Sequence, residues 1–289
     1  MRSFDPTTLS TPRLYGYLSS GIAPRPIAFV STRDADGRVN LSPYSFFNVF
    51  GTRPPTLVFS PVRRGRDGSS KDTLDNVLAT REAVVNIVNF PLVEQMSLAS
   101  TEYPTGVNEF IKAGLTEVPS ERVKPPRVAE APLAFECRVT DVIATGEGGG
   151  AGNLVICEVV MIHIDERYLR EDDTLDTTKL DLVARMGESW YCRASGEALF
   201  EIPKPIHTLG IGVDRLPEHV RTSHVLSANN LGRLGNAERL PTPEELAAER
   251  LTEELREIAA ADHLDARHKL AKDLLERGEV ERALRVLSL

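Results

Sequence analysis

The stretch LAFECRVTDVIATGEGGGAGNLVICEVVMIHI (133–164) places two long runs rich in β-branched residues on either side of a glycine-rich segment. A nucleotide-binding glycine loop follows a strand and opens a helix, whereas here strand-like sequence continues beyond the glycines. We therefore interpret residues 146–152 as the flexible turn of a β-hairpin. Residues 133–145 and 153–164 are its predicted strands.

Shorter runs with the same composition precede this hairpin: PIAFVST (26–32), TLVFSP (56–61) and AVVNIVNF (83–90). Short strands bounded by Gly, Pro, Asp and Asn favour a closed or nearly closed antiparallel barrel. The segment DADG (34–37) predicts a tight hairpin turn, because Gly37 can adopt a positive φ angle.

Helical segments are predicted to interrupt the barrel at about 8–19, 72–81 and 92–113, the last of them broken near Pro104 and Gly106. In the second segment, Leu74, Val77 and Leu78 have the spacing of one buried helical face.

The texture of the sequence changes after Pro205, and we predict a domain over 1–205 followed by a helical C-terminal extension over 206–289. Thr242 is a predicted N-cap, with Pro243 in the first turn and Glu245 completing a capping box. Apolar residues then recur at helical spacing: Leu251, Leu255, Ile258, and beyond Gly278 also Val280, Leu284 and Leu287. This pattern predicts two or three helices packed as a hairpin. The stretch 270–287 resembles one helix pair of a tetratricopeptide repeat, but such repeats need several copies, so packing or oligomerisation is favoured over peptide binding.

Composition excludes several classes of protein. The 289 residues carry a formal net charge of −8 without a long basic run, which argues against nucleic acid or an anionic membrane as the partner. Cys137, Cys157 and Cys192 form no CxxC pair, which fits a reducing compartment and argues against disulfides or a thiolate metal site. The N-terminus lacks signal-peptide zones, and no apolar run reaches about 18 residues. We expect a soluble cytoplasmic protein.

The segment GSSKDTLDN (68–76) leads from small polar residues into a predicted helix at Lys71 and Asp72. A helix start exposes unpaired N–H groups and a partial positive charge, so it suits an anion. One lysine and several hydroxyl donors add what a phosphate dianion requires. The alternative is an ordinary helix start capped by Ser70 or Asp72.

Two other polar stretches accompany this segment. APRPIAFVSTRDADG (23–37) ends its strand with Ser31 and Thr32, and NLSPYSFFNVF (40–50) mixes polar and aromatic residues in a way that suits an amphipathic strand poorly. Each stretch alone has a structural alternative, as a strand end or as core and interface packing.

Together and in this order, these segments resemble the flavin reductase-like family of FMN-binding split barrels. The matching elements are RPIAFVST, DGRVNLSPYSFFN, PTLVFSP, KDTLDNVLATREAVVNIVN, VVMIHID and RMGESWYC. The resemblance covers about residues 10–205 and implies a mainly β fold with added helices. The expected architecture is an FMN-binding split β-barrel plus a C-terminal helical extension.

The resemblance also implies a ligand, since the family holds FMN in a groove at the rim of the barrel, commonly at a homodimer interface. The residues it places at the flavin are Ser31 and Thr32 along the ring or ribityl chain, Ser45, Phe46, Phe47 and Asn48 at the ring and phosphate, Ser60 as a polar contact, and Lys71, Asp72 and Thr73 at the phosphate. Asp72 is expected to cap the helix and to orient Lys71.

Three further residues are weaker candidates for catalysis. His163 lies in a strand-like run, where a structural, hydrogen-bonded histidine is the favoured alternative. Arg185 and Tyr191 could reach the flavin edge or a nicotinamide, or could simply pack in the barrel. Many NAD(P)H-using relatives carry a histidine just before the strand 153–164; this chain has Gly152–Asn153 there, which weakens the case for nicotinamide as reductant.

No Ser/His/Asp, Cys/His or HExxH arrangement is recognisable, which fits an enzyme whose cofactor carries the chemistry. The leading hypothesis is an FMN-dependent oxidoreductase, most simply an NAD(P)H:flavin reductase that is a homodimer and supplies reduced flavin to a partner monooxygenase. The alternatives are an FMN-dependent oxidase or monooxygenase acting on a small organic substrate, and a non-catalytic flavin- or haem-binding electron carrier.

Overall fold

The computed structural model describes residues 1–202, 209–250, 252, 255 and 264–289. The chain divides into two compact units, Met1–Phe200 and Glu201–Leu289. Each unit has its own apolar core.

The first unit is built around β-strands. Their bounds are β1 (Ala28–Arg33), β2 (Val39–Tyr44), β3 (Phe47–Thr52), β4 (Pro55–Phe59), β5 (Glu82–Ile87), β6 (Glu117–Val118), β7 (Arg127–Val128), β8 (Leu133–Ala144), β9 (Asn153–Ile164), β10 (Val183–Arg185) and β11 (Tyr191–Arg193). Its α-helices are α1 (Thr11–Gly21), α2 (Asp72–Thr80), α3 (Val93–Leu98), α4 (Glu109–Ala113) and α5 (Thr177–Leu180). Short 3-10 helices cover Pro6–Thr8, Phe90–Leu92, Glu166–Tyr168 and Gly196–Ala198.

Seven strands form one antiparallel sheet in the order β2-β1-β5-β8-β9-β4-β3. Its two edge strands, β2 and β3, follow one another in the chain and are joined by Ser45 and Phe46 alone. Six inter-strand gaps in a flat sheet would span roughly 29 Å, whereas a two-residue link reaches about 11 Å. The sheet must therefore curl until its edges meet. No ladder joins β2 to β3 within residues 1–202, so the barrel keeps an unpaired seam, and the predicted split barrel is confirmed.

The predicted hairpins are also confirmed. β8 and β9 pair along their length, and residues 146–152 connect them as a turn closed by the Thr145 N–H donating to the Gly152 carbonyl at 2.9 Å. The turn between β1 and β2 has Gly37 at φ +87°. Glycine is suited to this position because it has no Cβ to clash in the left-handed region.

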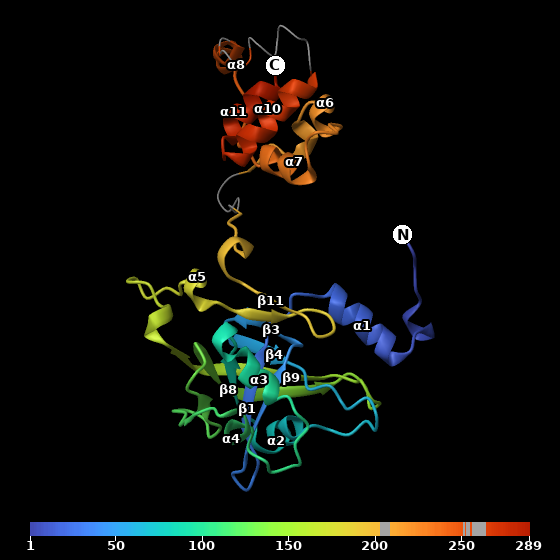
Figure 1. Ribbon diagram of the computed structural model, residues 1–289, viewed down its shortest axis with the longest axis vertical. Coiled ribbons are helices and arrows are strands. Elements are labelled where there is room, and N and C mark those ends of the chain that lie inside the picture. Colours follow the sequence, from blue (N-terminus) through green and yellow to red (C-terminus); the bar gives the residue numbers. More distant parts are fainter. Residues whose placement is uncertain (203–208, 251, 253–254, 256–263) are drawn as a thin grey trace. The chain divides into compact units, whose positions relative to one another are not determined.

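Strand β1 is buried on both faces. Phe29 packs into one apolar cluster with Met96 of α3 and Phe110 of α4, whereas Val30 packs into another with Val77 of α2. Successive side chains of a strand point to opposite faces, so helices cover both sides of β1 (Figure 1). The polar residues at the end of β1, Ser31 and Thr32, are therefore buried as well.

The predicted helices occur with one local correction. Leu74 and Val77 of α2 are buried, but Leu78 is exposed. The buried face of α2 also contains the polar residues Thr73 and Asn76, which turn toward β1 and β2. That choice rotates Leu78 toward solvent. The long predicted segment at 92–113 is two short helices, α3 and α4, separated by the region of Pro104 and Gly106.

The second unit contains the helices α6 (Glu218–Arg221), α7 (Ala228–Gly235), α8 (Pro243–Arg250), α10 (Leu264–Glu276) and α11 (Val280–Leu287), with a 3-10 turn at Val213–Arg215. The capping box before α8 is confirmed, because Thr242 N–H donates to Glu245 Oε2 and Glu245 N–H donates to Thr242 Oγ1. Buried Glu249 of α8 accepts hydrogen bonds from Arg282 and Arg285 of α11. Helices α10 and α11 pack together as predicted.

This unit contains one helix that the sequence did not predict, and two predicted apolar positions lie outside the described residues. Helix α7 was not predicted; its N-cap Ser227 forms a capping box with Asn230 in place of the usual Glu or Gln. The predicted apolar positions Leu251 and Ile258 lie outside the described residues. None of the described helices is long and apolar enough to cross a membrane.

Candidate functional site

Polar and aromatic side chains gather where β2 continues into β3 at the seam. Ser45 Oγ accepts a hydrogen bond from Arg25 Nη1 at 2.7 Å, and Arg25 Nη2 donates to the Met186 carbonyl at 2.6 Å. The guanidinium carbon of Arg25 lies 5.6 Å from the centre of the Phe46 ring. The main chain of Phe46 is fixed in turn, since its carbonyl accepts from the Ser60 N–H at 2.8 Å. Arg25 therefore holds the start of the seam and leaves the Phe46 ring partly exposed.

The remaining aromatic and amide residues predicted here take different positions. Phe47 is half-buried against the barrel core. Asn48 is exposed, and its Oδ1 accepts from the Val49 N–H at 2.8 Å.

The chain after β4 forms a cationic loop, residues 61–70, that runs up to Lys71. A hollow of about 350 Å³ lies against it, lined by Val62, Arg63, Arg64, Gly65, Arg66, Lys71 and Glu102. Four of these seven residues are cationic and one is anionic. Such a lining attracts an anion.

Several donors around this hollow have no hydrogen-bond acceptor among the described residues. Arg63 Nε and Arg64 Nε are buried without one, and Arg64 Nε forms an ion pair with Glu102 Oε1 at 3.4 Å. Lys71 makes neither a hydrogen bond nor an ion pair with the described residues, and its ammonium lies 5.4 Å from the centre of the Tyr44 ring. Burial, and then the charge of Arg64, lower the pKa of Lys71 below its ordinary value. An anion bound in the hollow would offset both the cost of burying the Lys71 charge and its repulsion by Arg64.

The start of α2 differs from the prediction. Lys71 itself occupies the N-cap position, with an extended backbone and no side-chain cap. Asp72 is the first helical residue, and its Oδ1 accepts from Thr105 Oγ1 at 3.2 Å. Ser70 Oγ donates to Asp75 Oδ2 at 2.9 Å. The prediction that Asp72 caps the helix and orients Lys71 is wrong, because the turn of the chain places Asp72 one position too late to cap.

Three of the predicted flavin-contacting hydroxyl residues have almost no exposed surface: Ser31, Thr32 and Thr73. Ser31 Oγ donates to the carbonyl of Pro126 on one side of β1. The hydroxyls of Thr32 and Thr73 accept from Asn76 and Asn40 at 3.0 and 2.7 Å on the other side. These three hydroxyls tie α2 and the loop before β7 to the sheet, so in this structure their side chains are not presented to a ligand.

Ser60 is buried behind the cationic loop. Its Oγ accepts from the Asn153 N–H at 3.0 Å, and Asn153 Nδ2 donates to the Pro61 carbonyl at 2.8 Å. The departure noted in the sequence, Gly152–Asn153, therefore lies against the chain just before the loop. Asn153 is itself buried, and its side chain supports the turn at 60–61.

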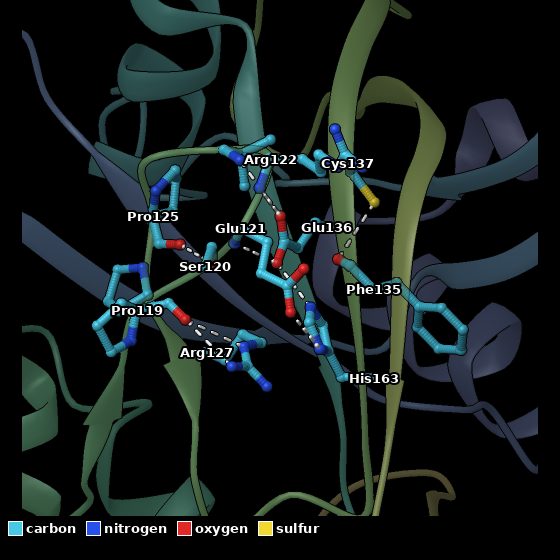
Figure 2. A network of polar contacts seen from close by, with 12 residues as sticks. Pro119, Ser120, Glu121, Arg122, Pro125, Arg127, Phe135, Glu136, Cys137 and His163 are labelled. Atoms are coloured by element: carbon cyan, nitrogen blue, oxygen red, sulfur yellow. Dashed lines mark hydrogen bonds and ion pairs between the residues drawn. The ribbon is translucent and has the colours of Figure 1, made fainter.

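His163 belongs to a buried polar network (Figure 2). Its Nε2 lies 2.6 Å from Glu136 Oε1, and the fully buried Glu136 carboxylate also accepts from the N–H groups of Glu121, Arg122 and Val123. Burial alone raises the pKa of Glu136, but these hydrogen bonds outweigh it, so the pKa lies below its usual value. The geometry favours the structural alternative for His163, which fastens residues 121–123 to β8 and β9.

Arg185 and Tyr191 face one another across the β10–β11 hairpin. The guanidinium of Arg185 lies 4.8 Å from the centre of the Tyr191 ring, and its Nη2 donates to the Glu188 carbonyl at 2.6 Å. The main chain of Arg185 pairs with that of Arg25 at 2.9 Å in both directions. This hairpin therefore supports the Arg25 end of the seam, and contact of either side chain with a flavin or nicotinamide stays a prediction.

The arginines are the functional candidates missing from the sequence-based set. Arg63, Arg64 and Arg66 fall within four residues, directly before the segment that was singled out at 68–76. Their density was the available signal. Arg25 gave no signal, because it follows one proline and precedes another in what looks like a strand entry.

The chain thus combines a split barrel with a cationic hollow whose lining suits an anionic ligand. The flavin reductase like domain matches residues 20–179 of this chain, and the chain belongs to that family. A relative from Aquifex aeolicus is 37% identical over 189 residues, which are 65% of this chain and 94% of the relative. One from Halalkalibacterium halodurans is 39% identical over 189 residues, covering 65% of this chain and 90% of the relative.

Solved structures give the same fold. The nitrilotriacetate monooxygenase component B from Bacillus cereus is 31% identical, with a TM-score of 0.65, and the match covers 70% of this chain and 98% of that one. The 2-nitrobenzoate 2-nitroreductase of Pseudomonas fluorescens is 26% identical, with a TM-score of 0.63 over 72% of this chain and 100% of that one.

Proposed function

We propose that this protein is an FMN-dependent oxidoreductase in which NAD(P)H reduces the flavin. The observation that carries the proposal is the cationic hollow, where the Lys71 ammonium and the Nε atoms of Arg63 and Arg64 have no hydrogen-bond acceptor among the described residues, Arg64 Nε being ion-paired with Glu102 at 3.4 Å. A phosphate dianion supplies the acceptors that these donors need.

When bound, the flavin accepts a hydride and passes on its electrons, so the chain has to position rather than to react. Lys71, Arg63 and Arg64 would hold the phosphate end. Phe46, partly exposed and fixed by Arg25, offers an aromatic edge for a ring placed along the seam. The chain must also exclude water from that surface and hold the flavin and nicotinamide rings face to face.

Two titrations test the cofactor. FMN should bind to the purified protein with a change in flavin fluorescence, and FAD is titrated for comparison. Lys71→Ala should weaken FMN binding by roughly 10- to 100-fold, the worth of one charge-assisted hydrogen bond. Lys112→Ala, on the exposed surface of α4, is the matched control. If Lys71→Ala binds FMN as tightly as the wild-type protein, the assignment of Lys71 to the phosphate is wrong.

Stopped-flow absorbance tests the reaction. The FMN-loaded protein is mixed anaerobically with NADH or with NADPH, and the flavin should bleach on a catalytic timescale with at least one of them. If neither bleaches it, nicotinamide is not the reductant.

A second candidate is the direct reduction or oxygenation of a small organic substrate. It is favoured by Gly152–Asn153, which stand where nicotinamide-using relatives carry a histidine just before this strand, and the Asn153 side chain is bound to the Pro61 carbonyl. The same loaded protein, mixed after chemical reduction with nitroaromatic compounds or with oxygen and a substrate, separates this candidate from the first.

We also propose a homodimer, and a separate monooxygenase that receives the reduced flavin. Exposed apolar side chains on α1, directly after it and on β3 support the dimer: Tyr15, Leu18, Ile22, Val49 and Phe50. The monooxygenase partner rests on the similarity to the component B described above. Light scattering after size-exclusion chromatography decides the dimer, and transfer of reduced flavin to an added monooxygenase decides the partner.

A further inference from the structure

The glycine-rich turn between β8 and β9 lies against the cationic loop, main chain to main chain. The Arg63 N–H donates to the Ala151 carbonyl at 2.9 Å, and the Gly150 N–H donates to the Arg63 carbonyl at 3.1 Å. Two hydrogen bonds in opposite directions fix the peptide at Arg63 relative to the turn. This is the residue whose Nε lacks an acceptor beside the hollow.

The approach is so close that it requires glycine at one position. A Cβ built on Gly149 would lie 2.7 Å from the Gly65 carbonyl oxygen and 3.0 Å from that of Arg64. Both neighbours are main-chain atoms, so the cationic loop would have to move. Gly148, next to it in the same turn, has nothing within 4 Å of a built Cβ.

The rest of the cationic loop transmits such a movement to its side chains. The Gly68 N–H donates to the Arg64 carbonyl at 2.8 Å, and Arg63 Nη1 donates to the Gly68 carbonyl at 3.1 Å. Arg64 Nη1 donates to Ser69 Oγ at 3.2 Å and to the Ser70 carbonyl. The guanidiniums are thus bonded to the main chain of their own loop, and displacement of its backbone displaces them together.

We propose that Gly149 is a positioning residue for the phosphate end of the flavin site, and that the glycine-rich turn sets the preference of this protein for a phosphorylated flavin. The inference rests on the proposed flavin site. This role accounts for the glycine run. A nucleotide-binding role does not, because the turn presents its backbone to another loop and not to a ligand.

The test compares the dissociation constants of FMN and of riboflavin, which has the same ring and ribityl chain but lacks the phosphate. In the wild-type protein FMN should bind more tightly than riboflavin. Gly149→Ala should lower this FMN-over-riboflavin ratio by about tenfold, the size of one lost charge-assisted hydrogen bond, with riboflavin affinity unchanged. Gly148→Ala should keep the wild-type ratio.

The outcomes separate the two proposals. A wild-type ratio near one overturns the phosphate site and, with it, this inference. A clear wild-type ratio that Gly149→Ala retains overturns the inference alone, as does an equal loss of both flavins in a folded Gly149→Ala protein. If Gly149→Ala does not fold, Gly150→Ala decides, because its φ of +89° strains the peptide whose N–H is bonded to the Arg63 carbonyl. A lowered ratio in that variant supports the proposal, and an unchanged ratio overturns it.

Discussion

Replacing Glu136 by glutamine should destabilise the first unit strongly while changing its shape very little. Each carboxylate oxygen accepts two hydrogen bonds: Oε1 from the Glu121 N–H at 2.8 Å and from His163 at 2.6 Å, Oε2 from the N–H groups of Arg122 and Val123 at 2.6 and 3.2 Å. An amide nitrogen in place of Oε2 faces two main-chain donors, whereas in place of Oε1 it faces the Glu121 N–H and a histidine that can accept in its other tautomer. The substitution therefore leaves at least one buried donor without an acceptor, so the free energy of unfolding should fall by about 1–3 kcal/mol.

Urea denaturation followed by far-UV circular dichroism measures this loss, and hydrogen exchange at the amides of 121–123 localises it. Glu158→Gln is the control, because Glu158 lies on β9 with an exposed side chain and should stay within about 0.5 kcal/mol of wild type. The pKa of Glu136 is lower in the folded protein than in the unfolded chain. Its stabilisation is therefore complete above the unfolded value of 4.5 and is lost as the pH falls below it, where wild type and Glu136→Gln should converge. A Glu136→Gln protein as stable as the Glu158→Gln control at neutral pH would refute the reasoning.

Three further outcomes are expected. Glu249→Gln weakens a buried carboxylate held by two arginines of α11, so calorimetry should show the second unit losing about 3–5 kcal/mol with flavin binding unchanged, whereas exposed Glu276→Gln should have no effect. Burial and a neighbouring histidine lower the pKa of His268 from its usual 6.5, so the folded state favours the neutral imidazole. The melting temperature of the second unit should therefore fall as the pH drops below about 6.5. A melting temperature that stays constant between about pH 5 and 8 would contradict this. Gly37→Ala should cost about 1–2 kcal/mol through its φ of +87° alone, since no atom lies within 4 Å of the added carbon, whereas Gly16→Ala within α1 should stabilise by about 0.5–1 kcal/mol in the same denaturation assay.

The barrel could be predicted because its signals are local. Alternating β-branched residues, Gly37 and the 146–152 turn each specify strand or turn within a few residues, and no distant contact overrides them. The seam could not be predicted from these signals. It follows from strand order, and only the order shows that β2 and β3 are opposite edges joined by two residues.

The site was predictable in part, for the same reason. The segment around Lys71 was found because a lysine among small polar residues before a helix is a local pattern. Ser31 and Thr32 were assigned to the ligand through the family resemblance, but helices cover both faces of β1 here and both side chains are buried. Glu136 gave a signal that was missed: a lone carboxylate within an apolar strand requires buried donors, and His163 on the adjacent strand is one of them.

The two-residue link at Ser45 and Phe46 limits how this barrel can change. Because the edge strands are tethered at one end, the gap between them there cannot widen without lengthening the covalent chain. Substitutions elsewhere can change the side chains along the seam, but they cannot change the distance between the two edge strands at this end. Insertions between β2 and β3 are thus the economical way for evolution to admit bulkier molecules, and homologues that differ in link length should differ in the breadth of compounds they accept.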